Sequence, residues 1–309
     1  MKTGKKSPAA QLRSIALTVT AVFGLTSAAI AQRDFSSVEI ATTDLGNSVY
    51  LLMGAGGNIG VSAGPDGVFM IDDQFAPLSE KIIAAIAEIS DQPVRYVLNT
   101  HWHGDHTGGN ENMGNTGAVV VAHENVRKRM STPQFIKAFG REVPAAVDAA
   151  LPVITFTQDA TFYFNDTQIQ VSHLPHAHTD GDSMVFFTDA NVLHMGDTFF
   201  NGFYPFIDES SGGSLDGLIE AANHALGIIN DDTQIIPGHG NLATKADLQG
   251  YLDMLKEVKA IMNPLANSGK SRDEVIAQQP LKTLSEKWGN GFMKPDVFTG
   301  IIFNIESGS

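Results

Sequence analysis

A short apolar run followed at once by clustered histidines places the strongest constraint on this chain. Residues 94–98, Val-Arg-Tyr-Val-Leu, have the composition of a largely buried strand, and residues 100–110 read Thr-His-Trp-His-Gly-Asp-His-Thr-Gly-Gly-Asn. Four potential ligands lie close together in this stretch: His101, His103, Asp105 and His106. Imidazole nitrogen and carboxylate oxygen are ligands that a borderline divalent ion such as zinc prefers. The sequence therefore predicts a metal site at the end of a strand.

Runs of β-prone residues separated by turn formers occupy two regions of the chain. In the first region, strands are expected at 49–53, 59–63, 68–71, 94–98 and 118–122. In the second, we expect a hairpin turning at Asn165-Asp166 and strands at 183–188, 192–195 and 234–236.

Apolar residues at helical spacing follow each β-rich region. Helices are predicted over 77–90, 123–130, 214–226 and 244–263, with Ser214 as a cap and a capping box at Ser271. The Ala- and Pro-bearing segment 132–152 is expected to be helical in pieces. Two β-rich regions, each followed by helices, predict a single α+β domain in which stacked sheets are covered by helices.

The first 31 residues have the pattern of a secretory signal. A basic leader with Lys2, Lys5, Lys6 and Arg13 precedes a short apolar segment at 14–27, and Ala29-Ile-Ala31 supplies a small-x-small cleavage site. The apolar segment is too short to cross a bilayer as a stable helix. We therefore expect a signal peptide over 1–31, a folded domain over 32–309, a periplasmic location and no membrane attachment after cleavage.

Composition restricts the partners and the metal ligands. The formal net charge of −14 disfavours nucleic acid, because phosphate binding requires a basic face. The chain contains no cysteine, which excludes disulfides and thiolate ligands. We expect the partner to be a small-molecule substrate.

Three later positions would complete a ligand set, and each comes just after a predicted strand. His178 follows the strand at 167–173, Asp197 follows 192–195, and His239 follows 234–236. Glycine or another turn former flanks each of them, which lets the backbone approach an ion closely. His176 competes with His178 for the first of these positions. A catalytic zinc site needs three protein ligands, and a two-metal site needs about twice as many.

The order His-x-His-x-Asp-His, His-Thr-Asp, Gly-Asp-Thr and Pro-Gly-His-Gly resembles the metallo-β-lactamase-fold hydrolase superfamily. The resemblance spans nearly all of the expected mature chain. It implies a four-layer αββα sandwich with a di-zinc site at one edge of the two sheets. The Thr-Asp that follows His178 matches the family and favours this histidine over His176.

The resemblance also assigns the ligands to two Zn²⁺ ions. The first ion would be bound by His101, His103 and His178, and the second by Asp105, His106 and His239, with Asp197 bridging. A hydroxide held between the ions would attack a carbonyl, and Asp105 would orient it.

On this basis we predict a zinc-dependent hydrolase that opens a cyclic amide. We expect it to be a β-lactamase of weak or promiscuous activity, and its predicted export fits this reaction because the periplasm is where cell-wall inhibitors act. Two departures weaken the match. Asp197 stands where the common β-lactamase subclass has cysteine, and Phe200 stands where that subclass has a lysine that holds the substrate carboxylate.

The bridging aspartate instead resembles lactonases and thioesterases of the superfamily. A periplasmic lactonase or esterase, acting for example on acyl-homoserine lactones, is the alternative enzyme. Hydroxyacylglutathione thioesterases are disfavoured, because they are intracellular and their basic glutathione-binding residues cannot be placed near this C terminus. An exported metal-binding accessory protein is the non-enzymatic alternative, although structural zinc sites are usually closed and mononuclear.

Aromatic residues that follow Asp197 are the candidates for a substrate pocket. They are Phe200, Phe203 and Tyr204, within the cluster that runs from Phe199 to Phe206. Such a run is equally typical of a plain core.

Overall fold

The computed structural model describes residue 1 and residues 34–308, and Phe35–Ser309 form one compact unit. Apart from Met1, the predicted signal segment lies outside the described residues. Within the described part of the chain, no helix combines the length and the apolar character that crossing a membrane requires.

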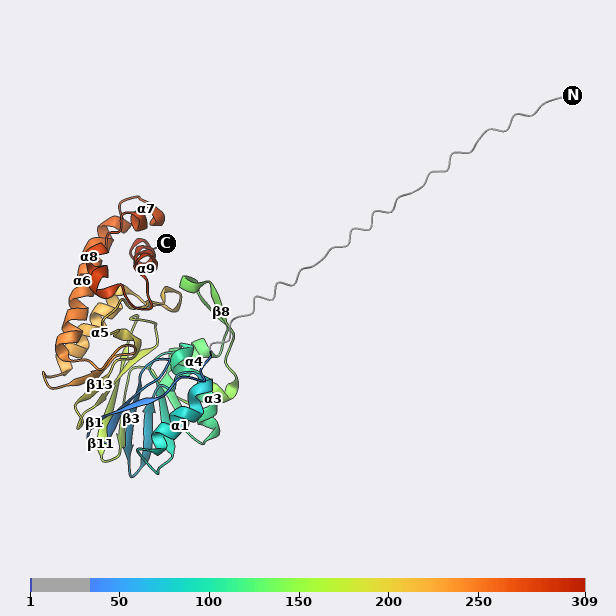
Figure 1. Cartoon of the computed structure of the whole chain (residues 1–309), viewed down its shortest axis with the longest axis vertical. Coiled ribbons are helices and arrows are strands. Elements are labelled where there is room, and N and C mark those ends of the chain that lie inside the picture. Colours follow the sequence, from blue (N-terminus) through green and yellow to red (C-terminus); the bar gives the residue numbers. More distant parts are fainter. Residues whose placement is uncertain (2–33, 309) are drawn as a thin grey trace. The chain divides into compact units, whose positions relative to one another are not determined.

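Seven strands form the first sheet, in the order β1-β2-β3-β4-β5-β6-β9. Figure 1 labels two of these strands, β1 and β3, which are drawn in blue. The strands are β1 (Ala41–Gly46), β2 (Val49–Met53), β3 (Ile59–Gly64), β4 (Gly67–Ile71), β5 (Val94–Asn99), β6 (Val119–His123) and β9 (Ile154–Phe156). Pairing is antiparallel from β1 to β4 and parallel from β4 to β9. The sheet is therefore mixed.

Five strands form the second sheet, in the order β10-β11-β12-β13-β14. They are β10 (Asp159–Phe164), β11 (Thr167–Leu174), β12 (Asp182–Phe187), β13 (Val192–His194) and β14 (Gln234–Ile236). Only β13 and β14 pair in parallel. The predicted hairpin is present: Asn165 and Asp166 adopt φ of 54° and 58°, the pair of positive values that a type I′ turn requires.

Nine α-helices are present in the described residues: α1 (Ser79–Ala87), α2 (Gly104–Thr107), α3 (Asn110–Asn115), α4 (Glu124–Met130), α5 (Leu215–Ile228), α6 (Lys245–Ala266), α7 (Arg272–Ala277), α8 (Lys282–Trp288) and α9 (Pro295–Ser307). The predicted caps are confirmed. The Ser214 side chain accepts a hydrogen bond from the Gly217 backbone, and a capping box forms at Ser271. A second capping box, which was not predicted, forms at Thr244.

Three apolar cores separate the layers. Strand β4 shows why, because successive side chains of a strand point to opposite faces. Val68 and Met70 pack with helix α1, whereas Phe69 and Ile71 pack between the sheets with residues of β11 and β12. The outer face of the second sheet packs against α5 and α6. The predicted four-layer αββα sandwich is confirmed.

The prediction for segment 132–152 is largely wrong. Two three-residue strands, β7 (Gln134–Ile136) and β8 (Arg141–Val143), pair in a hairpin, with the 3-10 turn η2 (Lys137–Phe139) between them. Gly140 follows in the left-handed region at φ 56°, which ends η2 and reverses the chain. Helical pieces are limited to η2 and to η3 (Asp148–Ala150). Helices α2, α3, α8 and α9, and strands β1 and β9, were not predicted either.

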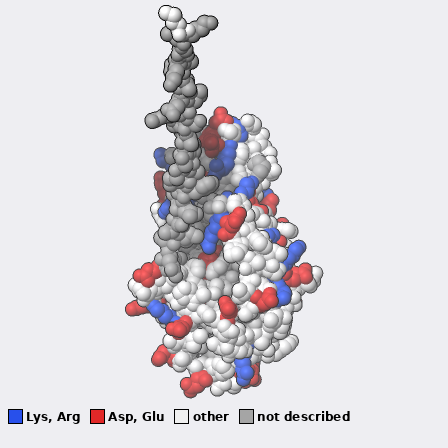
Figure 2. Space-filling view, turned by 90° about the vertical axis from the view of Figure 1, so that its right-hand side faces the viewer, with Lys and Arg blue, Asp and Glu red and all other residues white. Residues whose placement is uncertain are grey.

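On the face drawn in Figure 2, Lys and Arg side chains alternate with Asp and Glu side chains among the described residues. Charges of both signs are therefore mixed on this face.

Candidate metal centre

Both sheets deliver polar side chains to one edge of the sandwich. His101 and His103 follow β5, and His178 follows β11. Asp197 lies in the 3-10 turn η4 (Gly196–Thr198) after β13, and His239 follows β14. Since the backbone N–H of Asn58 donates to the Gly238 carbonyl at 2.8 Å, the two sheets are joined at this edge.

The seven predicted ligands gather in two clusters. One contains His101, His103, His178 and Asp197, and the other contains Asp105, His106 and His239; within each cluster the ligand atoms lie within 4.8 Å of one another. The structure therefore brings together all seven residues that the sequence singled out.

Asp197 connects the two clusters. Its Oδ2 lies 3.8 Å from His101 Nε2 and 3.6 Å from His178 Nε2. Its Oδ1 lies 3.1 Å from His106 Nε2 and 3.4 Å from His239 Nε2. One carboxylate therefore presents one oxygen to each cluster, which is the arrangement that a residue shared by two ions needs.

Hydrogen bonds fix the rings of His103 and His178. Nε2 of His103 donates to Asp208 Oδ2 at 3.0 Å, and Nδ1 of His178 donates to the Phe206 carbonyl at 2.8 Å. Each ring then turns its other nitrogen towards the first cluster. These nitrogens, His103 Nδ1 and His178 Nε2, face each other at 2.8 Å. Partners of this kind set the tautomer and orientation of ligating imidazoles.

Asp72 performs the same task for His101 and His106. Its Oδ2 accepts from His106 Nδ1 and from the Thr100 hydroxyl, both at 2.7 Å, and the Thr100 oxygen lies 3.1 Å from His101 Nδ1. Asp72 comes directly after β4 and has φ of 62°, in the left-handed region. This unfavourable backbone conformation is held by its contacts, including the Thr100 N–H on Oδ1 at 2.7 Å.

Two glycines allow the backbone to approach the ligands. A Cβ at Gly238 would lie 2.1 Å from Asp197 Oδ1, and a Cβ at Gly57 would lie 2.1 Å from the His106 ring. Only a residue without a side chain fits at these two positions.

The clusters differ in electrostatics. Burial lowers the pKa of His178 to about 4 and lowers the pKa of His101 well below its usual value. Burial acts in the same direction on His239, but Asp197 and Asp105 outweigh it and raise the pKa of His239 to about 9. Burial would raise the pKa of Asp197, yet His239 and His106 hold it well below its usual range. His101 and His178 of the first cluster are therefore neutral imidazoles, whereas His106 and His239 of the second are protonated beside carboxylates.

The donor set fits two divalent ions. Zinc binds imidazole nitrogen at about 2.0–2.1 Å in tetrahedral geometry, which puts neighbouring ligand atoms roughly 3.3 Å apart. The separations between ligand atoms given above lie near this value. In addition, Nε2 of His101 is buried and has no hydrogen-bond partner among the described residues. An ion would satisfy that nitrogen, because a buried polar atom without a partner is costly.

The two clusters open to solvent on one side. The side chain of Asp105 is 31% exposed and that of His239 is 25% exposed, whereas the other five ligands are buried. A substrate would therefore reach the centre beside Asp105 and His239.

The remaining predicted candidates have different positions. His176 is exposed and its Nδ1 contacts the Gly212 carbonyl at 3.1 Å, outside both clusters. Phe200 stacks on His239 at a centroid distance of 5.3 Å, and Phe203 packs edge-on to Phe200 at 5.8 Å.

The structure contradicts the pocket assignment of Tyr204. This residue is fully buried, its ring stacks on Phe298 of α9 at 4.2 Å, and its hydroxyl lies 3.2 Å from Ser285 Oγ. Tyr204 therefore belongs to the core beneath the C-terminal helices.

Asp72 and Asp208 were missed in the sequence. Asp72 had a signal, because it directly follows a predicted strand that pairs in parallel with the strand before the histidines. Asp208 had none, because it lies in an irregular segment before the 3-10 turn η5 (Glu209–Ser211).

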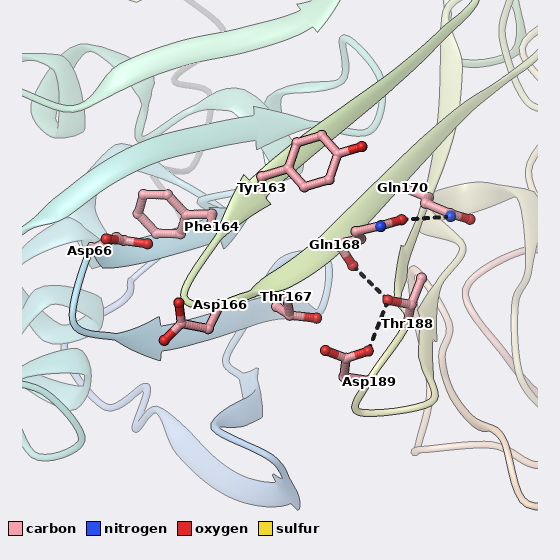
Figure 3. Close-up of a pocket in the computed structure, with 9 residues that line it drawn as sticks. All are labelled: Asp66, Tyr163, Phe164, Asp166, Thr167, Gln168, Gln170, Thr188 and Asp189. Carbon is pink, nitrogen blue, oxygen red and sulfur yellow. Dashed lines mark hydrogen bonds between the residues drawn. The ribbon is translucent and has the colours of Figure 1, made fainter.

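A separate hollow of about 600 Å³ lies beside the β10–β11 turn (Figure 3). Tyr163, Gln168 and Asp189 are among the residues that line it. None of the seven ligands takes part, so this hollow is distinct from the metal centre.

The family model described as the metallo-beta-lactamase superfamily matches residues 43–241, which contain all seven ligands. The chain belongs to the metallo-beta-lactamase superfamily. The two clusters are consistent with a binuclear metal site, and the protein is a metal-dependent hydrolase of this superfamily.

Curated relatives within the superfamily carry one recurrent name. The chain is 30% identical over 170 residues to the hydroxyacylglutathione hydrolase GloC of Haemophilus influenzae, covering 54% of this chain and 77% of that protein. It is 28% identical over 195 residues to the hydroxyacylglutathione hydrolase of Nitrosococcus oceani, covering 60% of this chain and 66% of that protein.

Solved structures share the superfamily fold. A metallo-beta-lactamase from Pontibacter korlensis superposes with a TM-score of 0.57 at 19% identity, covering 71% of this chain and 99% of that one. A double mutant of the sec-alkyl sulfatase PisA1 superposes with a TM-score of 0.62 at 14% identity, covering 86% of this chain and 50% of that one.

Proposed function

We propose that the protein hydrolyses acyl bonds of the ester class, with thioesters and lactones as its substrates, at a site that holds two zinc ions. The observation that carries this proposal is the position of Asp197, which presents one oxygen to each cluster. Two ions held by His101, His103 and His178 and by Asp105, His106 and His239 would supply a Lewis acid and lower the pKa of water.

The protein's own residues would position the reacting groups. Asp105 is the partly exposed carboxylate of the centre, and its Oδ2 lies 3.3 Å from His239 Nε2. From there it would orient water by accepting a hydrogen bond from it and hold the water in line with a carbonyl carbon, so we propose Asp105 as the catalytic residue. The buried ligands beneath it keep bulk water away from the floor of the site.

Three arguments favour an ester-class bond. The curated relatives are named for hydrolysis of hydroxyacylglutathione, which is a thioester. Among the described residues, no Lys or Arg forms an ion pair or hydrogen bond with any of the seven ligands. Phe200 stacks on His239 and offers no charge to a substrate carboxylate.

Opening of a β-lactam ring, which the sequence placed first, becomes the second candidate. The predicted export favours it, because a periplasmic enzyme would meet such compounds. Since Phe200 offers no positive charge to their carboxylate, we propose that this activity is weak or promiscuous. We also propose the periplasm as the location, with small molecules rather than nucleic acid as partners.

One assay tests the proposal. Zinc-loaded protein is incubated with an acyl thioester, an acyl-homoserine lactone and a chromogenic cephalosporin, with and without a chelator. We expect chelator-sensitive turnover of the thioester or the lactone that exceeds turnover of the cephalosporin, and its loss in Asp105→Asn. Turnover of the cephalosporin alone would overturn the proposal in favour of a β-lactamase. No turnover of any of the three would remove both enzymatic proposals and leave the accessory metal-binding protein.

A further inference from the structure

Three aromatic rings lead from the metal centre to the protein surface. The Phe206 ring lies 5.7 Å from the His103 ring, nearly parallel to it, and 5.5 Å from the His178 ring. Phe139 packs on Phe206 at 4.8 Å, and Phe292 packs on Phe139 at 5.7 Å. We call Phe206, Phe139 and Phe292 the aromatic wall.

The outer two rings of the aromatic wall are exposed to water, which is unfavourable for apolar side chains. Phe139 is 44% exposed and Phe292 is 66% exposed, whereas Phe206 is 6% exposed. Contacting apolar side chains at a surface mark binding sites when they adjoin a functional centre. The aromatic wall begins on His103 and His178 of the first cluster and ends at two exposed rings, so it links that cluster to the protein surface.

Separate parts of the chain hold the outer rings in place. Phe139 ends η2 in the β7–β8 hairpin, where the Lys137 backbone N–H donates to Ser210 Oγ at 3.1 Å and the Lys137 ammonium lies 3.6 Å from Glu209. Phe292 follows Gly291, where a Cβ would lie 2.5 Å from the Phe203 ring. The ion pair with Glu209 also neutralises Lys137, one of the two basic residues that lie two positions from Phe139 in the chain.

We propose that the aromatic wall binds the apolar acyl chain of the substrate and makes the protein selective for medium-length acyl groups. This proposal rests on the proposed function, because it specifies the acyl part of the same ester-class substrate. Each CH₂ laid against the rings leaves water, and partial burial of one CH₂ corresponds to about a two- to threefold gain in affinity.

The test is a series of thioesters with one uncharged thiol and acyl groups from acetyl to octanoyl. We expect the KM of the wild-type protein to fall about two- to threefold per added CH₂ until the chain passes Phe292. In Phe139→Ala and Phe292→Ala, octanoyl should lose most of this advantage while acetyl turnover stays close to wild type. Phe292→Ala is the safer variant for folding, because its ring is the more exposed.

Tyr163→Ala is the matched control, because Tyr163 is 78% exposed and lines the separate hollow in Figure 3. It should keep the wild-type dependence on chain length. A KM independent of chain length in the wild type, or equal discrimination in the wild type and both Phe variants, would overturn the proposal.

A binding measurement separates this proposal from the proposed function. Calorimetric titration of metal-free protein with 1-butanol, 1-hexanol and 1-octanol needs no turnover. Tighter binding of longer alcohols to wild type, lost in Phe139→Ala and kept in Tyr163→Ala, supports the aromatic wall even if no thioester is hydrolysed. Equal binding by all three proteins overturns the aromatic wall, whatever the assays of hydrolysis give.

Discussion

His103 Nε2 and Asp208 Oδ2 lie 3.0 Å apart, although 105 residues separate them in the chain. The carboxylate is buried and also accepts from the hydroxyls of Ser210 and Ser211, at 2.7 and 2.6 Å. The Ser211 oxygen in turn accepts a hydrogen bond from Trp102 Nε1 at 3.1 Å, and Trp102 precedes His103 in the sequence. Asp208 is therefore a positioning residue that holds the His103 ring. Its hydrogen bonds lead through Ser211 to Trp102, the residue next to His103.

Replacing Asp208 should weaken the first metal site. In Asp208→Asn the side chain keeps its shape but loses its charge, so we expect zinc affinity to fall about 10- to 100-fold, as is typical for carboxylates behind ligating histidines. Competition with a chromophoric chelator measures this. Asp180→Asn is the control, because Asp180 pairs with Arg129 at 2.7 Å and contacts no ligand histidine. Equal zinc affinity in wild type and Asp208→Asn would contradict the role given to Asp208.

Asp105→Asn should separate catalysis from metal binding. Loss of the carboxylate that orients the water is expected to reduce kcat about 10²-fold. Because six of the seven ligands are untouched, we expect the first ion to remain bound and the thermal midpoint to stay close to wild type. Steady-state kinetics on protein of measured zinc content tests this. A variant with two zinc ions and wild-type kcat would rule out a catalytic role for Asp105.

Gly238→Ala should disturb the shared carboxylate. The new Cβ would lie 2.1 Å from Asp197 Oδ1 and 2.5 Å from the Gly196 carbonyl carbon, so Asp197 must move. We expect fewer than two zinc ions per chain by elemental analysis. Gly227→Ala is the matched control, because its Cβ meets nothing within 4 Å and it lies near the end of α5. That substitution should be neutral or stabilise by up to about 1 kcal/mol.

Metal binding at the second cluster should depend on pH. The pKa of His239 is raised from 6.5 to about 9, and that of His106 is raised well above 6.5, so in the metal-free protein both carry protons at pH 7. An ion must displace these protons, and its affinity should rise about tenfold per pH unit for each proton released. His101 and His178 are neutral at that pH, so these two ligands of the first cluster release no proton when an ion binds between pH 6 and 8.

Protonation of His239 also makes the stability of the metal-free protein depend on pH. Because the folded pKa of His239 exceeds the unfolded value, its contribution is complete below pH 6.5 and is lost as pH rises through about 9. Urea unfolding of metal-free protein between pH 6 and 9.5 measures this. The decline should be shallower in His239→Gln, and an identical pH dependence in the two proteins would contradict the assignment.

Residues of the metal centre could be predicted where a local sequence pattern marks them, and could not where only a contact with a distant part of the chain does. His101, His178 and His239 each follow an apolar run bounded by turn formers, and strand ends that meet at one edge bring them together. Tyr204 was placed wrongly because a run of aromatic residues does not show which rings point inward. Strands β7 and β8 were missed because three residues are too few for a period of two to appear. Asp208 could not be predicted, because no pattern in the sequence around residue 208 indicates that His103 lies beside it.

The family match ends at residue 241, yet the segment after Asp197 depends on helices beyond that point. The Tyr204 backbone N–H donates to the Trp288 carbonyl at 2.8 Å, and its ring rests on Phe298. A loop transplanted here from a relative would lack these supports unless α8 and α9 travelled with it. In protein engineering, residues 199–213 and the C-terminal helices should therefore be exchanged together. To transfer selectivity between superfamily members, both segments must be replaced at once.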